Sequence, residues 1–150
     1  VKNYDFKVSY SRSQTIKGFI NDIKVDFIRF DYPHLFPCDN IENIRIESIP
    51  DIIAMKLLSI TDNGSRIKDF IDIAFLSSRY SLNDMLNFYL KKIPNSNALM
   101  PLKALTYFED IDFKESVVML NHAFDWTEIS ARLMDMANSP NKIFPEPFST

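Results

Sequence analysis

The chain has 150 residues, enough for one domain with a real core or for a small sheet with a helical lobe. Its formal charge of −3 gives no basic field, which argues against non-specific nucleic-acid binding as the main function. The only glycines are Gly18 and Gly64, and their scarcity excludes a glycine-rich phosphate-binding loop within these residues.

Alternating apolar and polar residues predict a sheet in the first third of the chain. The predicted strands span residues 3–10, 14–20 and 23–30. Asn21 and Asp22 form a good two-residue hairpin loop between the last two, because both side chains tolerate positive φ. Residues 31–43 contain two prolines and are predicted to be a surface loop, and residues 44–47 are predicted to form a short fourth strand.

The pattern becomes helical at Ser48. Residues 48–51, Ser-Ile-Pro-Asp, form a capping box with proline in the first turn, and a helical period follows to about Ile60. Ser81 and Asp125 are plausible N-caps of later helices. Further helices are predicted over residues 66–79, 81–92, 98–108, 114–121 and 126–137.

Strands followed by helices indicate an α+β fold. We therefore expect a sheet-forming part over residues 1–47, a helical domain over residues 48–138 and a tail over residues 139–150. No apolar run approaches the ~20 residues that span a bilayer, so we expect a cytoplasmic protein without membrane contact.

Lys56 interrupts the apolar stripe of the first predicted helix. The stripe is formed by Ile49, Ile52, Ile53 and Ile60, and Lys56 lies in its middle. A lysine on a core-facing side must extend to the surface, pair with a carboxylate or face a cleft. The sequence leaves these three alternatives open.

The second predicted helix carries charges in apolar surroundings. Lys68, Asp69 and Asp72 share one face, because Lys68 and Asp72 are four residues apart and the two aspartates are three apart. Buried charges need partners, so a cation between two carboxylates is consistent with this helix. The cluster is equally compatible with a structural ion-pair network and with a catalytic site.

Asp26 lies in the middle of the third predicted strand, although aspartate is a poor strand former. A carboxylate that projects from a sheet is a common Mg²⁺ ligand, whereas the alternative is a solvent-facing residue on the polar side of the strand. Cysteine and histidine are scarce, since Cys38 is the only cysteine and His34 and His122 lie far apart. We therefore predict no internal disulfide and no Cys/His cluster for zinc.

The order in which these candidate site residues occur along the chain resembles the motif order of a known family. The stretches IKVDFIRFDYP, IESIPDIIAMKLLSI and NGSRIKDFIDIAFL resemble the AbiEii-type nucleotidyltransferases, bacterial toxins of abortive-infection, type IV toxin–antitoxin systems used in phage defence. YSLNDMLNFYLKK and ALTYFEDIDF also look like the family's helical region, so the resemblance covers roughly residues 14–125. Its most specific part is Arg66-x-Lys68-Asp69-x-x-Asp72, placed after the helix that bears Lys56.

The resemblance implies part of a polymerase-β-like nucleotidyltransferase sheet followed by a helical bundle, with Mg²⁺ and an NTP, either GTP or ATP, as cofactors. Asp26 matches a metal-binding carboxylate, and Lys56, Arg66 and Lys68 match positions that contact the nucleotide phosphates. Asp69 and Asp72 would orient these lysines or serve the acceptor hydroxyl, for example of an RNA. The residues that the resemblance places in the catalytic site are Asp26, Lys56, Lys68, Asp69 and Asp72.

The family's Gly-Ser turn followed by an Asp-x-Asp strand does not occur in the 150 residues. Gly64-Ser65 contains the residues of the Gly-Ser turn, and Asp110-Ile111-Asp112 contains those of the Asp-x-Asp motif. Both segments lie in the helical region, in the wrong sequence context for the family's site. We expect this segment upstream of Val1, interpret the chain as a fragment, and expect it to be inactive alone.

Two other functions stay open on the sequence. The chain could be a non-catalytic interaction module or accessory subunit of a toxin–antitoxin or phage-defence system. It could also be a nucleic-acid-binding adaptor, although it lacks a basic stripe with stacking aromatic residues. A truncated sheet would expose a strand edge, which invites self-association or pairing with the missing N-terminal half.

Overall fold

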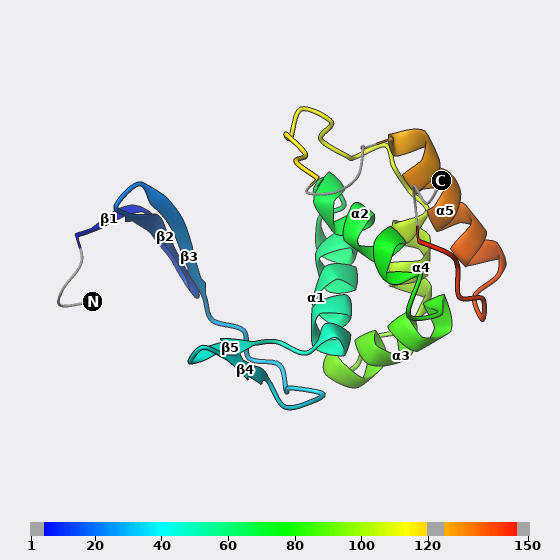
Figure 1. Cartoon of the computed structure of the whole chain (residues 1–150), viewed down its shortest axis with the longest axis horizontal. Helices are drawn as coiled ribbons and strands as arrows, with labels where there is room; N and C mark the ends of the chain where they lie inside the picture. The colour runs from blue at the N-terminus through cyan, green and yellow to red at the C-terminus, as the bar shows by residue number, and fades with distance from the viewer. Residues whose placement is uncertain (1–4, 120–124, 147–150) are drawn as a thin grey trace. The chain divides into compact units, whose positions relative to one another are not determined.

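The computed structural model describes residues 5–119 and 125–146, and the chain divides into two compact units. The first, Val1–Pro33, is called the sheet unit, and the second, His34–Thr150, the helical unit. The sheet unit contains β1 (Phe6–Arg12), β2 (Thr15–Ile20) and β3 (Ile23–Ile28). The helical unit contains β4 (Asp39–Ile41), β5 (Ile44–Ile46), α1 (Ile49–Asp62), α2 (Ile67–Leu76), α3 (Leu82–Lys92), α4 (Leu99–Leu105) and α5 (Trp126–Asn138). Strands precede helices, which confirms the predicted α+β class (Figure 1).

The three strands of the sheet unit pair in the order β1-β2-β3, and both pairs are antiparallel. Asn21 and Asp22 turn the chain between β2 and β3 with φ of 47° and 65°, which confirms the predicted two-residue hairpin. Across this hairpin Lys17 lies opposite Asp26, so the two side chains fall on the same face of the sheet.

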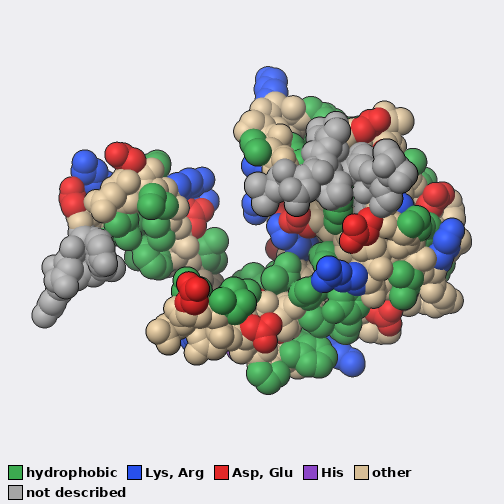
Figure 2. Space-filling model, in the orientation of Figure 1, with side chains coloured by type: hydrophobic (Ala, Val, Ile, Leu, Met, Phe, Trp, Pro, Cys, Tyr) green, Lys and Arg blue, Asp and Glu red, His purple; other side chains and the backbone are tan. Residues whose placement is uncertain are grey.

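The sheet unit has almost no core of its own. Gly18 is the only buried residue among those that the structure describes in this unit. Large apolar side chains are exposed instead: Val8, Tyr10, Ile16, Phe19, Ile23, Phe27 and Ile28. Figure 2 shows hydrophobic side chains grouped on the visible face of this unit. A three-stranded sheet needs a covered apolar face to be stable, so this surface is suited to packing against further polypeptide.

In the helical unit, α1 is the central helix, since it packs against α2, α3 and α4, while α5 packs against α2. The core comes from all of these helices, with Ile53, Leu57, Phe70, Met85 and Ile129 fully buried. None of the helices in the described residues has the length and apolar composition needed to span a bilayer.

The helix starts follow the predicted caps. The Ser48 hydroxyl accepts a hydrogen bond from the Asp51 amide at the start of α1, and Ser81 and Asp84 form a reciprocal capping box on α3. The Asp125 side chain accepts from the Thr127 amide at the start of α5. The predicted N-caps at Ser81 and Asp125 are therefore confirmed.

Two predicted elements differ in the structure. Residues 39–41, placed in the predicted loop 31–43, form β4 and pair with β5, because Glu42 and Asn43 adopt φ of 50° and 66° and close a tight hairpin. The fourth predicted strand exists, but in this separate two-stranded sheet.

The predicted helix 114–121 is absent over residues 114–119, and residues 120 and 121 lie outside the described residues. The Asp112 side chain accepts from the Lys114 amide, which gives this backbone a turn in place of a helical hydrogen bond. The β-branched pair Val117-Val118 adds to the preference against helix.

Gly18→Ala should loosen the sheet unit. A Cβ atom at this position would lie 2.4 Å from the Lys7 carbonyl oxygen and 2.5 Å from the Phe6 ring, so the strands would have to separate. We expect a cost on the order of 1–3 kcal/mol, seen as faster hydrogen exchange of β1 and β2 amides. Gly64→Ala is the control, because its nearest neighbour would be at 3.4 Å. Equal exchange in both variants would contradict this packing.

Candidate functional site

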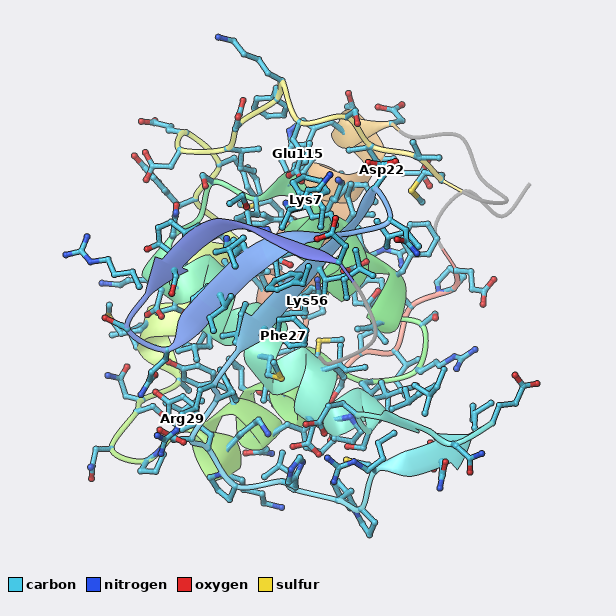
Figure 3. The ribbon with its side chains drawn as sticks, turned by 90° about the vertical axis from the view of Figure 1, so that its left-hand side faces the viewer. Lys7, Asp22, Phe27, Arg29, Lys56 and Glu115 are labelled. Carbon is cyan, nitrogen blue, oxygen red and sulfur yellow. The ribbon has the colours of Figure 1, made fainter. Side chains whose placement is uncertain are left out.

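The predicted charged residues of the first two helices meet where α1 packs against α2. The connection between the helices is short, and it lets the second half of α1 face the first half of α2. Lys56 projects from α1, and Asp69 and Asp72 project from α2 toward it. Lys56 is labelled in Figure 3, together with Glu115 from the segment after α4.

Lys56 bridges both aspartates. Its Nζ lies 2.6 Å from Asp69 Oδ1 and 2.7 Å from Asp72 Oδ2. The second oxygen of Asp69 accepts a hydrogen bond of 2.7 Å from the Ser59 hydroxyl, and Arg66 approaches the same oxygen at 3.8 Å. Of the three alternatives for Lys56, the structure therefore shows pairing with carboxylates.

The two carboxylates differ in burial. The Asp69 side chain is 2% exposed, whereas that of Asp72 is 48% exposed and that of Lys56 is 24% exposed. A buried carboxylate without partners would be costly, and Asp69 has Lys56, Ser59 and Arg66 around it. Asp69 thus holds the lysine in place from inside, while Asp72 contacts it from the solvent side.

Burial alone would lower the pKa of Lys56, because it disfavours the charged ammonium. The hydrogen bonds from Lys56 to Asp69 and Asp72 outweigh this effect and raise the pKa above its ordinary value of 10.5. The ammonium therefore stays protonated throughout the neutral range, which is the state that an anionic ligand requires.

Lys68 has a different partner from the one that its spacing suggests. Its Nζ lies 3.0 Å from Glu115 Oε1, and the cation between Asp69 and Asp72 is Lys56. The side chains of Arg66 and Lys68 are 58% and 44% exposed, so both cations are accessible near the bridge. The sequence could not show this exchange, because it depends on how α1 packs against α2.

Asp26 belongs to the sheet unit, whereas the other predicted site residues belong to the helical unit. It forms a cross-strand ion pair with Lys17 at 3.8 Å. In the described residues, no group of three or more His, Cys, Asp or Glu side chains includes Asp26. The donor set around Asp26 is thus a single carboxylate, which does not by itself make a Mg²⁺ site.

A fully buried ion pair, which the sequence interpretation missed, lies at the start of α1. Asp51 Oδ1 accepts from Lys92 Nζ at 2.5 Å, and both residues are at most 1% exposed. Lys92 continues the apolar stripe of Leu82, Met85 and Tyr89 on α3, which is the same signal that singled out Lys56.

Asp51 also holds the loop that precedes β4. Its carboxylate accepts from the Leu35 amide at 2.9 Å and the Phe36 amide at 3.2 Å. Burial would raise the pKa of Asp51, but the hydrogen bonds from Lys92, Ser48 and the two amides lower it to about 2.

The structure brings together a group of potential metal ligands that the sequence interpretation did not anticipate. His34, Cys38 and Glu47 place one ligand atom each within 4.8 Å of one another. The sequence interpretation counted only cysteine and histidine along the chain, whereas the β4–β5 hairpin brings a glutamate back beside both.

Comparison with protein families identifies the chain. The family model "Nucleotidyl transferase AbiEii toxin, Type IV TA system" matches residues 8–145, which includes parts of both units. The chain belongs to this family, and the resemblance drawn from its motifs is confirmed. Comparisons with curated proteins and with solved structures give no match.

Asp69→Asn should destabilise the helical unit more than Asp72→Asn. The first change leaves Lys56 facing a buried amide and should cost about 3 kcal/mol, whereas the second removes a half-exposed partner and should cost at most about 1 kcal/mol. Urea unfolding of both variants measures the difference. Equal losses would mean that Asp69 does not anchor the lysine.

Stability should fall as the pH drops from about 4 to about 2. The pKa of Asp51 is depressed from its ordinary value of 3.8 to about 2 in the folded chain, so its contribution is present above 3.8 and lost on protonation. In the double variant Asp51→Asn/Lys92→Met, which removes both buried charges, the acid-dependent loss should be smaller. An unchanged loss in unfolding experiments at several pH values would contradict this assignment.

Proposed function

We propose that this chain provides nucleotide-contacting residues of a nucleotidyltransferase toxin, which transfers a nucleotide from an NTP to an acceptor. The observation that carries the proposal is the bridge of Lys56 between Asp69 and Asp72. Membership of the AbiEii family supports the reaction class. GTP or ATP as donor, Mg²⁺ as cofactor and an RNA as acceptor are parts of this proposal.

Lys56 is the proposed phosphate ligand. An ammonium group has three N–H donors, and among the described residues Asp69 and Asp72 take two of them. The third can serve a phosphate oxygen, and the raised pKa keeps the group charged. Because Asp69 fixes its position before the ligand arrives, little side-chain entropy remains to be lost on binding.

Arg66 and Lys68 extend the proposed site along α2. Arg66 has a planar fork of donors suited to two phosphate oxygens, and its side chain is largely exposed. Lys68 would add a second ammonium after leaving Glu115. Asp72 is half-exposed and is the carboxylate that we assign to the acceptor hydroxyl, while Asp69 acts as a positioning residue through Lys56.

Asp26 is the proposed metal ligand of the sheet unit. It supplies one carboxylate, and the Gly-Ser turn followed by Asp-x-Asp that the family resemblance implies does not occur in the 150 residues. We therefore propose that these residues by themselves bind nucleotide but transfer it poorly or not at all. The division at residues 47 and 138 into sheet, helical domain and tail is likewise a proposal.

Nucleotide binding by the 150-residue chain tests the proposal. We expect fluorescent GTP or ATP analogues to bind in the presence of Mg²⁺, and Lys56→Met to weaken binding at least tenfold, about 1.4 kcal/mol. Lys91→Met, an exposed lysine at the end of α3, is the matched control and should bind as the parent chain does. Equal affinity in the two lysine variants would overturn the site.

A second variant separates binding from folding. Arg66→Gln removes an exposed charge whose contact with Asp69 is long, so the circular dichroism spectrum should not change while affinity falls. If Lys56→Met unfolds the chain, this variant still decides the question. Unchanged affinity in a folded Arg66→Gln chain would remove Arg66 from the site.

A non-catalytic interaction module is the alternative, and the exposed apolar residues of the sheet unit favour it. The open strand edges and apolar surface would pair with a second copy or with a polypeptide that completes the sheet. Light scattering that shows a monomer together with nucleotide binding would favour the transferase proposal. A dimer that binds no nucleotide would favour the module.

A further inference from the structure

A mixed cluster of potential metal ligands lies at the start of the helical unit, away from the bridge of Lys56. His34 and Cys38 are in the loop before β4, and Glu47 follows β5. In the β4–β5 hairpin Asp39 pairs with Ile46, so the chain returns to place Glu47 next to Cys38. The three residues thus come together through the hairpin.

The spacing of the three ligand atoms fits one bound ion. His34 Nδ1 lies 3.1 Å from Glu47 Oε2 and 3.8 Å from Cys38 Sγ, and Cys38 Sγ lies 3.7 Å from Glu47 Oε2. Zinc bonds of about 2.0 to 2.3 Å in tetrahedral geometry separate neighbouring ligand atoms by about 3.4 to 3.6 Å. The separations in the chain are within a few tenths of an ångström of these values.

We propose that His34, Cys38 and Glu47 bind a divalent transition metal, with Zn²⁺ as the expected ion. A thiolate, an imidazole and a carboxylate are a donor set that zinc accepts, whereas Mg²⁺ and Ca²⁺ prefer oxygen ligands alone. The site is therefore chemically distinct from the magnesium-dependent chemistry proposed for nucleotide transfer. No other His, Cys, Asp or Glu of the described residues joins the group.

The surroundings leave the site accessible. The His34 and Glu47 side chains are 59% and 32% exposed, and an open pocket is lined by His34, Leu35, Phe36, Pro37, Cys38 and Arg45. Three protein ligands leave the fourth position of a tetrahedral ion to water or to an external group. An ion can thus enter without opening the core.

The bound ion would stabilise a segment that is already tied to α1. The Leu35 and Phe36 amides, between two of the ligands in sequence, donate to the buried carboxylate of Asp51. Metal binding would join this loop to the end of β5 as well. We therefore expect the ion to raise the thermal stability of the loop and the hairpin, through mass action on the folded state.

Cobalt binding by the reduced 150-residue chain tests the proposal. We expect one Co²⁺ per chain and a thiolate-to-cobalt charge-transfer band in the near ultraviolet. Adding Zn²⁺ should displace the Co²⁺ and abolish this band. Cys38→Ser should abolish the band, and His34→Ala and Glu47→Gln should each weaken Co²⁺ affinity tenfold or more. Glu42→Gln, an exposed carboxylate in the turn between β4 and β5, is the matched control and should bind as the parent chain does.

Two outcomes would overturn the proposal. One is the absence of the charge-transfer band at saturating Co²⁺. The other is a band that persists at the parent affinity in both His34→Ala and Glu47→Gln, since the thiol would then bind metal without its partners. Circular dichroism of each variant keeps the result interpretable, because a folded variant that fails to bind supports the site. Nucleotide binding measured on the same variants should be unchanged, so this site and the nucleotide site are tested separately.

Discussion

The buried ion pair between Asp51 and Lys92 is the contact on which the helical unit depends. Both groups are out of water, so each carboxylate lone pair and ammonium proton needs a partner within the protein. Asp51 meets this requirement by accepting from Lys92, Ser48 and the amides of Leu35 and Phe36. One carboxylate thereby joins the start of α1, the end of α3 and the loop before β4.

Fixing α1 at its start also orients the residues further along it. Lys56 follows Asp51 by little more than one helical turn, and its ammonium meets Asp69 and Asp72 on α2. α1 thus carries the buried Asp51–Lys92 ion pair at its start. The partly exposed bridge of Lys56 lies further along the same helix. Asp51 is fully buried, whereas the Asp72 side chain is 48% exposed, so only the second of these carboxylates can be reached from solvent.

Local signals predicted much of this structure. The Asn21-Asp22 hairpin, the caps at Ser48 and Ser81 and the interrupted stripe at Lys56 were all readable, because each depends on residues close together in the chain. Contacts between residues far apart in the chain could not be predicted: Lys56 pairs with Asp69, thirteen residues away on another helix, and Lys68 pairs with Glu115 in the segment after α4. β4 was missed because Asp39-Asn40-Ile41 contains two poor strand formers and one apolar residue, whereas the equally short β5, Ile44–Ile46, shows an alternation.

The bridge of Lys56 also constrains which substitutions this chain can accept. A single substitution at Lys56 or Asp69 removes one partner from the bridge and leaves a partly buried ammonium or a buried carboxylate with fewer contacts. Such positions are energetically coupled, so their substitutions are not additive. Related sequences that lose the lysine should therefore carry a compensating change on α2, and covariation between these positions on α1 and α2 would mark the contact in sequences with no structure.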